Sequence, residues 1–441
     1  MLKITMMGAG SSVFVKNVLG DTLMCDNLCE CEIALYDIDR ERLDESAMLI
    51  EAMNKTINKN RAVIKKYLGV ENRKEALKDA SFVINTIQVG GYEPATITDF
   101  EIPKKYGLLQ TIGDTLGIGG IMRGLRTIPV IKDFADDIEE VCPDAWFLNY
   151  TNPMSILTGF MTRFTNVKTI GLCHSVQVCS RDLLKALEID PENGYYDTIA
   201  GINHMGWLLD IRDGNGKDLY PEIRKKADEK NKNEKHNDMV RFEYIKRFGY
   251  YCTESSEHNA EYNSHFIKRQ YPQLIDEFNI PIDEYPRRCV NHIKKWAEQK
   301  EELMNGGNVT HERSREYASI IMEAMVTNIP YKIGGNVLNN GLITNLPSEA
   351  CVEVPCLVDK SGIHPTYIGA LPTQLAGMNS ACVFTQLLTI EAAISGNREK
   401  IYQAAMADRH TSAELSIDDI VKMCDELIDE HIRNGFRLSI K

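Results

Sequence analysis

The chain has 441 residues, of which 43% are hydrophobic and 26% are charged, and its formal net charge is −13 at pH 7. These fractions are ordinary for a globular protein, and the length suffices for two domains with a sizeable core. The acidic balance argues against a nucleic-acid partner and against docking on an anionic membrane. We find no apolar stretch as long as a membrane span. The opening residues MLKITMMGAGSS lead into a strand and a glycine turn, which is not the pattern of a signal peptide.

The 12 cysteines are scattered through apparent core segments of a long chain without an export signal. We therefore expect reduced thiols and a cytoplasmic location. The tightest group, Cys25, Cys29 and Cys31, has no second ligand cluster at the spacing of a zinc site. We expect these three side chains in the core.

The first half of the chain alternates strand and helix patterns. Apolar strands are predicted at 3–8, 31–39, 81–88, 145–150 and 167–173. Helices are predicted between and after them, at 11–23, 40–57, 126–141 and 178–189. Strands that alternate with helices of this length indicate an α/β fold, a doubly wound parallel sheet with helices on both faces.

The pattern changes past residue 195. Residues 198–211 alternate like one antiparallel strand, and residues 213–240 are polar and lysine-rich, as in an exposed insertion. Helical patterns dominate the remainder, at 315–328, 374–395 and 416–432. We therefore divide the chain into a nucleotide-binding domain, 1–195, and a mixed α+β, mainly helical domain, 196–441.

The motif MMGAGSS is the first candidate binding element. Gly8 and Gly10 follow a strand and precede a helix, so the backbone can turn tightly and approach a pyrophosphate at the amino end of the helix. Val13 stands where the usual third glycine of a dinucleotide fingerprint would be. A strand–turn–helix with purely structural glycines is the alternative.

Asp37 improves the case for a dinucleotide because it ends the second predicted strand. A carboxylate at that place binds a ribose diol and repels a 2′-phosphate, so the sequence favours NAD over NADP. Ser11 in the glycine turn and Asn85 near the end of the third predicted strand are the other expected cofactor contacts.

Residues 113–124 contain five glycines and are expected to form a flexible loop close to a ligand. Asp114, Arg123 and Arg126 supply charges there, and the carboxyl edge of the sheet is where open α/β folds bind ligands. An ordinary loop with a salt bridge is the alternative.

Asn149 and Asn152, in the motif LNYTNP, end the next strand and offer amides to sugar-like hydroxyl groups. Capping of the following helix is the alternative for Asn152.

Cys173 and His174 leave the fifth predicted strand at the same edge, and His204 follows in GINHMGW. Each histidine taken alone is more often a core residue. A thiol and an imidazole together at this edge suggest a metal held by few protein ligands, whereas a closed zinc site needs four. Such an open site suits Mn²⁺ or another catalytic divalent ion.

Several motifs together make the chain resemble glycoside hydrolase family 4, and within it the melibiase-type α-galactosidases: GAGS, VGGYEPATITDFEIPKKYGLLQTIGDTLGIGGIMRGLRTIP, LNYTNPM, GLCHSV, GINHMGW, TESSEHNAEY and DEYPRRCV. The resemblance covers nearly the whole chain. It implies a Rossmann-like NAD-binding domain of the lactate/malate dehydrogenase type, then a domain that binds substrate, completes the metal site and forms a homodimer or homotetramer. This NAD-dependent family is an exception among glycosidases.

The resemblance implies an elimination assisted by redox chemistry. NAD⁺ takes a hydride from C3 of the sugar, a base removes the acidified C2 proton, and the aglycone leaves C1. Water then adds and the hydride returns. A divalent metal, by analogy at Cys173 and His204, acts as a Lewis acid on the C2 and C3 oxygens.

Tyr262 is the base that the resemblance suggests, and His258 shares its face if this stretch is helical. Asp114 is a further candidate catalytic group. Other branches carry aspartates at places that are Ser256 and His174 here. His174 is therefore the candidate acid for the leaving group, and orientation of the metal or substrate is its alternative role.

The resemblance implies an unphosphorylated α-galactoside as substrate because CHSV matches that branch. The expected substrate contacts are Asn149, Asn152 and Arg288. An α-galacturonidase is the alternative, with Arg287 and Arg288 pairing a carboxylate, although a structural salt bridge explains these arginines equally well. Outside the family, the alternatives are a 2-hydroxy-acid dehydrogenase, which would need an Asp–His pair and no metal cysteine, and a non-catalytic NAD sensor.

Overall fold

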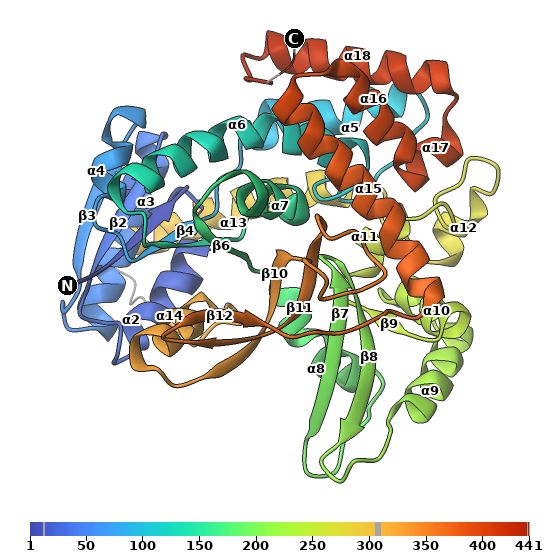
Figure 1. Cartoon of the computed structure of the whole chain (residues 1–441), viewed down its shortest axis with the longest axis horizontal. Coiled ribbons are helices and arrows are strands. Elements are labelled where there is room, and N and C mark those ends of the chain that lie inside the picture. Colours follow the sequence, from blue (N-terminus) through green and yellow to red (C-terminus); the bar gives the residue numbers. More distant parts are fainter. Residues whose placement is uncertain (12–13, 305–309, 439, 441) are drawn as a thin grey trace.

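The computed structural model describes residues 1–11, 14–304, 310–438 and 440. Within these residues one sheet of 12 strands runs through the molecule (Figure 1). Its order is β3-β2-β1-β4-β5-β6-β10-β11-β7-β8-β9, and β12 pairs with β11.

Six parallel strands form the first half of the sheet: β1 (Leu2–Met7), β2 (Cys31–Asp37), β3 (Val63–Leu68), β4 (Phe82–Asn85), β5 (Trp146–Asn149) and β6 (Lys168–Gly171). The predicted doubly wound α/β fold is confirmed. The strand β3 was not predicted, since it lies at the sheet edge and its half-exposed sequence VIKKYL lacks a buried alternating face.

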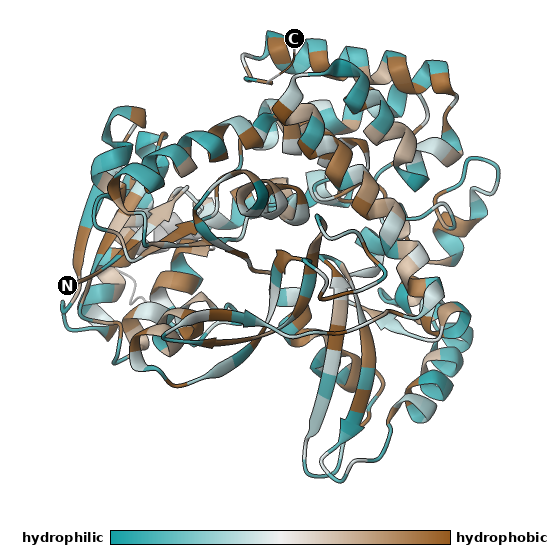
Figure 2. Cartoon of the chain, in the orientation of Figure 1, coloured by the Kyte–Doolittle hydropathy of each residue, from teal (hydrophilic) through white to brown (hydrophobic). Residues whose placement is uncertain are grey.

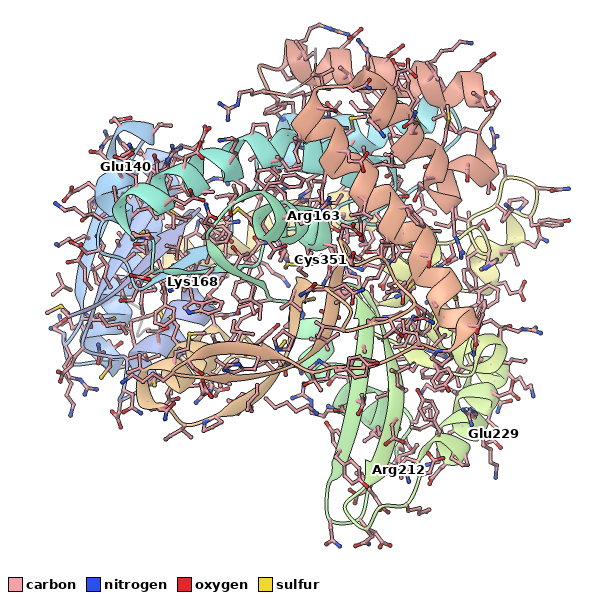
Figure 3. The ribbon with its side chains drawn as sticks, viewed as in Figure 1. Glu140, Arg163, Lys168, Arg212, Glu229 and Cys351 are labelled. Carbon is pink, nitrogen blue, oxygen red and sulfur yellow. The ribbon has the colours of Figure 1, made fainter. Side chains whose placement is uncertain are left out.

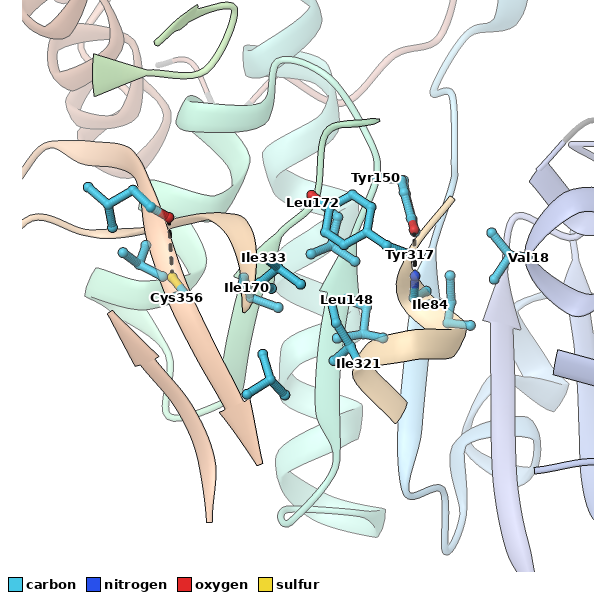
Figure 4. Close-up of a cluster of buried hydrophobic side chains, with 14 of the residues drawn as sticks. Val18, Ile84, Leu148, Tyr150, Ile170, Leu172, Tyr317, Ile321, Ile333 and Cys356 are labelled. Carbon is cyan, nitrogen blue, oxygen red and sulfur yellow. Dashed lines mark hydrogen bonds between the residues drawn. The ribbon is translucent and has the colours of Figure 1, made fainter. Parts of the chain in front are cut away.

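Alternate side chains of these strands enter two separate cores. Figure 4 shows one of them, where Ile84, Leu148 and Ile170 lie near Ile321 of helix α14 (Ala318–Thr327). The opposite face belongs to the core beneath α6 (Gly117–Val141) and α7 (Met154–Phe164). Full burial of one such aliphatic side chain contributes about 1.5–3 kcal/mol, so the sheet is held firmly from both sides.

The remaining helices of the first half are η1 (Val15–Leu19), α2 (Gly20–Met24), α3 (Arg40–Ile57), η2 (Val70–Asn72), α4 (Arg73–Leu77), η3 (Gly91–Thr96), α5 (Ile97–Lys105) and α8 (His174–Ala186). Helix α3 coincides with the predicted 40–57, and the side chain of Asp39 caps it by accepting a hydrogen bond from the Arg42 amide.

The predicted flexible loop at 113–124 is wrong, because α6 begins at Gly117. A Cβ on Gly119 would lie 2.3 Å from the Gly113 carbonyl oxygen, and one on Gly120 would lie 2.6 Å from the Thr115 carbonyl carbon. Glycine is needed here so that the helix can pack on the turn that precedes it.

The second half begins with a hairpin of β7 (Tyr195–Ile202) and β8 (Met205–Asp213). The prediction of one strand over 198–211 is wrong because His204 takes a left-handed φ of 62° and reverses the chain. The other strands are β9 (Tyr251–Cys252), β10 (Tyr331–Leu338), β11 (Cys351–Asp359) and β12 (Gly362–Pro365). Because β10 pairs with β6, the sheet continues past residue 195, and the division into two domains stays a prediction.

The other helices are α9 (Tyr220–Asn233), α10 (Met239–Phe248), α11 (Ser256–Glu261), α12 (Gln273–Glu277), α13 (Glu284–Met304), α15 (Thr373–Ser395), α16 (Arg398–Ala407), α17 (Arg409–Glu414) and α18 (Ile417–Arg433). The segment 213–240, predicted as an exposed insertion, is largely helical. Figure 2 shows α9 as mostly hydrophilic, yet Ile223 and Ala227 are buried.

Many charged side chains lie at the surface, whereas a smaller set that includes Asp114, Arg123 and Glu261 is buried. In Figure 3 the labelled Glu140 and Glu229 lie at the periphery and Cys351 lies inside. All 12 cysteines are free, and Cys25, Cys29 and Cys31 are buried, as predicted. Among the described residues no helix has the length and apolar character needed to cross a bilayer.

Candidate active site

Three ligand-type side chains from separate segments converge at the end of the parallel sheet. Cys173 follows β6, His204 closes the β7–β8 hairpin, and Glu254 follows β9. The Glu254 Oε2 atom lies 4.0 Å from the Cys173 Sγ and 3.5 Å from the His204 Nε2, and the three ligand atoms all lie within 4.8 Å of one another. This sulfur, nitrogen and oxygen set fits a divalent ion with open coordination positions.

Glu254 was missed by the sequence analysis. It and His204 have left-handed φ angles of 67° and 62°. Residues other than glycine rarely adopt this conformation, and it clusters at functional sites. Glu254 stands in the motif TESSEH, two residues after the short strand β9.

Burial sets the protonation of the two predicted ligands. It lowers the pKa of His204 to about 4, so the imidazole is neutral at pH 7 and keeps a lone pair for a metal. Burial, followed by the charge of Glu254, raises the pKa of the Cys173 thiol well above its usual value. The thiol is therefore protonated until a cation arrives, and metal binding would release its proton.

Tyr262 stands beside this cluster at the end of α11. Its hydroxyl group lies 3.1 Å from the Nδ1 atom of His204. Burial and the carboxylate of Asp114 raise the pKa of Tyr262 well above its usual value. The ring centroid of His258 lies 6.0 Å from that of Tyr262 and 4.8 Å from that of His204, so the three rings form one group.

Asp114 faces the same group from the turn before α6. Its Oδ2 accepts a hydrogen bond from the Asn152 side-chain amide (3.1 Å), and its Oδ1 lies 3.8 Å from the His258 Nε2. Burial alone would raise the pKa of Asp114. The nearby Arg123 and histidines lower this pKa by more than burial raises it, so the net shift is downward and the carboxyl group is ionised. The His258 Nδ1 lies 3.5 Å from the Glu254 Oε1, so this imidazole stands between the two carboxylates.

His174 is the exposed first residue of α8, next to Cys173. Its exposure and its place beside Cys173 put it at the rim of the cluster. Ser256 is directed elsewhere, because its hydroxyl group donates a hydrogen bond to Asp238.

The glycine turn after β1 lies against Asp37. Gly8 has a φ of 82°, and a Cβ there would lie 2.8 Å from the Ile87 backbone nitrogen. The Gly10 amide donates a 2.6 Å hydrogen bond to the Asp37 Oδ2, and Ser11 follows, partly exposed. This close backbone approach fits a dinucleotide. Val13 lies outside the described residues.

Asn85 ends β4 in the interior. Its Nδ2 donates to the Asn149 Oδ1 (2.9 Å), while its buried Oδ1 has no hydrogen-bond partner among the described residues. Both polar atoms of the Asn149 amide are hydrogen-bonded: its Oδ1 accepts from Asn85, and its Nδ2 donates to Thr151 and Thr158. Asn152 faces Asp114, and its side chain makes no hydrogen bond that caps α7.

Arg288 lies on α13, and its side chain is 38% exposed. It pairs with Glu284 (2.9 Å) and Glu257 (3.3 Å), and Arg287 also pairs with Glu284 (3.0 Å). Both arginines therefore form salt bridges with carboxylates of the chain itself, which was the alternative to binding an acidic sugar.

Comparison with known proteins agrees with this geometry. Residues 3–189 match the sequence model of the family 4 glycosyl hydrolases, and residues 199–411 match that of their C-terminal domain. The chain is 60% identical to an α-galactosidase of Bacillus subtilis (strain 168) over 98% of both chains. It is 35% identical to an α-galactosidase of Rhizobium meliloti (strain 1021), over 97% of this chain and 87% of that protein.

Among solved structures, a 6-phospho-alpha-glucosidase from gut microorganisms, in complex with NAD and Mn²⁺, has the same fold. The TM-score is 0.82 at 22% identity, and the match covers 100% of both chains. Matches to both family models, together with close relatives over nearly the full length, establish the family predicted from the motifs. The chain belongs to family 4 of the glycosyl hydrolases.

Proposed function

We propose that the protein is an α-galactosidase that hydrolyses α-galactosides with the help of NAD and a divalent metal ion. The observation that carries this proposal is the convergence of Cys173, His204 and Glu254 beside Tyr262, at the sheet edge that also holds the glycine turn. The 60% identity to an α-galactosidase supports the substrate class. The presence of NAD and Mn²⁺ in a structural relative supports the cofactors.

The three ligand side chains fit a divalent metal ion, and the glycine turn beside Asp37 fits a dinucleotide. Cys173, His204 and Glu254 would hold the metal ion, and the dinucleotide would be held by Gly8, Gly10, Ser11, Asp37 and Asn85. When bound, NAD⁺ supplies reversible oxidation at C3 of the sugar and the divalent ion supplies Lewis acidity to the neighbouring oxygens.

The side chains around the cluster have separate tasks in this proposal. A bound divalent ion would offset the raised pKa of the buried Tyr262 phenol, and its phenolate oxygen would then take the proton from C2, with the contact to His204 fixing its position. Asp114 and Asn152 are linked to each other and bind sugar hydroxyl groups. His174 is exposed at the rim, where it can donate a proton to the departing aglycone.

Two predicted substrate contacts act indirectly. Asn149 orients Asn85, and Arg288 ties α13 to α11 through Glu257. Because Arg287 and Arg288 are already paired with carboxylates, the structure offers them less readily to an acidic sugar. This favours a neutral galactoside over the α-galacturonide alternative. A cysteine within a metal-type cluster and membership of a hydrolase family argue against the dehydrogenase.

Hydrolysis of p-nitrophenyl-α-galactoside tests the proposal, with NAD⁺, Mn²⁺ and reductant omitted in turn. Activity should require each of the three. Full activity without NAD⁺, or faster turnover of the matching α-galacturonide, would overturn the assignment.

A further inference from the structure

Glu261 is a buried carboxylate that lies next to the site without facing it. Its side chain accepts hydrogen bonds from three consecutive backbone amides: those of Thr111 (2.8 Å), Ile112 (3.2 Å) and Gly113 (2.8 Å). The residue is only 4% exposed. Consecutive amides that point at one anion form a nest, an arrangement that few other partners can satisfy.

The two ends of this contact lead directly to two groups of the site. Gly113 is followed by Asp114, and Glu261 is followed by Tyr262. The contact therefore joins segments nearly 150 residues apart that carry the proposed base and the carboxylate facing it. A second hydrogen bond, from the Thr111 hydroxyl group to the Glu257 carbonyl oxygen (2.7 Å), ties α11 to the same turn.

We infer that Glu261 is a positioning residue for the reaction: it fixes Tyr262 relative to Asp114 and His204. The inference rests on the proposed function, because it takes Tyr262 as the base. The Tyr262 hydroxyl group contacts the His204 imidazole, and the way α11 is held sets where this tyrosine lies relative to Asp114. Displacement of a reacting group by about 1 Å can cost on the order of 100-fold in rate.

The test compares Glu261→Gln with Glu261→Asp and with Glu414→Gln. Glutamine presents an NH₂ group to amides that need an acceptor, whereas aspartate keeps the charge on a shorter side chain. Glu414 is a matched control, since it is also buried and accepts a hydrogen bond from a backbone amide, that of Arg269 (2.9 Å), but on α17. Each protein is assayed for kcat and KM on a galactoside, and for isotope effects with substrates deuterated at C2 or at C3.

For Glu261→Gln we expect kcat to fall by about 10- to 100-fold, with KM and the affinities for Mn²⁺ and NAD⁺ within about twofold of the parent. The C2 isotope effect should rise relative to the C3 effect because a displaced base slows C2 deprotonation alone. Glu261→Asp should recover part of kcat, and Glu414→Gln should lower stability without changing either isotope effect.

A merely structural role makes a different prediction. It would lower the active fraction and leave the ratio of the two isotope effects unchanged, and that result would overturn the inference, as would an unchanged kcat. If Glu261→Gln does not fold, Glu261→Asp provides the same comparison. A parent enzyme that shows no isotope effect at C2 and no dependence on NAD⁺ refutes the proposed function instead, so the two failures are distinguishable.

Discussion

The Nδ1 atom of His204 lies 3.1 Å from the phenolic oxygen of Tyr262, while the Nε2 atom of the same ring faces Glu254. A candidate metal ligand and a candidate base are therefore joined through one imidazole. A positive charge bound at the metal cluster would therefore act on the phenol across a single imidazole ring.

Replacement of Tyr262 by phenylalanine should lower kcat by about 10²–10⁴-fold, the usual contribution of a positioned acid or base. Mn²⁺ affinity should change little because the three ligand side chains remain. Tyr244→Phe is the control, since Tyr244 is also fully buried but donates its hydrogen bond to the Asn259 carbonyl oxygen. Steady-state kinetics and metal titration check this, and a Tyr262→Phe enzyme as active as the parent would remove the base assignment.

Glu254→Gln should weaken Mn²⁺ binding by at least about tenfold, since a neutral amide replaces the anionic ligand. Cys173→Ser should lose activity and Mn²⁺ dependence together. Both variants should still bind NAD⁺, because the glycine turn is separate from the cluster. Electron paramagnetic resonance of free Mn²⁺ measures the affinity, and tight Mn²⁺ binding by both variants would place the metal elsewhere.

Asp37→Ser should narrow the preference for NAD⁺ over NADP⁺. The parent carboxylate repels a 2′-phosphate, and serine removes this repulsion together with the acceptor for a ribose diol. Activity is measured as a function of each dinucleotide concentration. Equal activation of the parent enzyme by both dinucleotides would contradict the role given to Asp37.

Turnover in D₂O should leave deuterium at C2 of the released galactose. A proton removed from C2 exchanges with solvent before water adds, whereas direct displacement at C1 never breaks that bond. Proton NMR of the product decides between them. An undiminished C2–H signal would exclude elimination, and with it the roles given to NAD, the metal and Tyr262.

The metal-free protein should lose stability as the pH rises from about 5 to 8. Burial raises the pKa of Glu353, which is 0% exposed, from 4.5 to about 8. Between these values the folded chain keeps a proton that the unfolded chain has released, so unfolding becomes easier with rising pH. The full shift corresponds to roughly 5 kcal/mol. Denaturant midpoints at pH 5 and 8 should differ less in Glu353→Gln, and an equal difference in both proteins would contradict this.

The strands that lead to the glycine turn, Asn149 and Cys173 were predictable because each contains a short apolar run that becomes buried toward its end, where a functional side chain or a glycine turn follows. The edge strand β3 lacks such a run. Gly119 and Gly120 were misread as flexibility because local sequence does not reveal that the helix packs on its own preceding turn so closely that an added Cβ would lie 2.3–2.6 Å from backbone atoms.

The cluster was predicted only in part. Cys173 and His204 stand out because a thiol and an imidazole follow apolar strands. Glu254 lies 50 residues beyond His204 in a polar stretch with several carboxylates and hydroxyl groups, so neither periodicity nor spacing distinguishes it. The contact of Glu261 with residues 111–113 is likewise a matter of long-range packing, which no local pattern encodes.

The place of β10 and β11 in the sheet sets an order of assembly. Cys173 follows β6 and His204 follows β7, yet the two strands between them come from residues 331–359. A ribosome has therefore made both ligands long before the pair of strands that separates and aligns them exists. Such non-local strand pairing is slow to form. A nascent chain that ends before residue 331 therefore contains the six parallel strands but lacks the two strands that connect the segments of the metal cluster. The geometry of the site thus depends on residues that are synthesised well after Cys173 and His204.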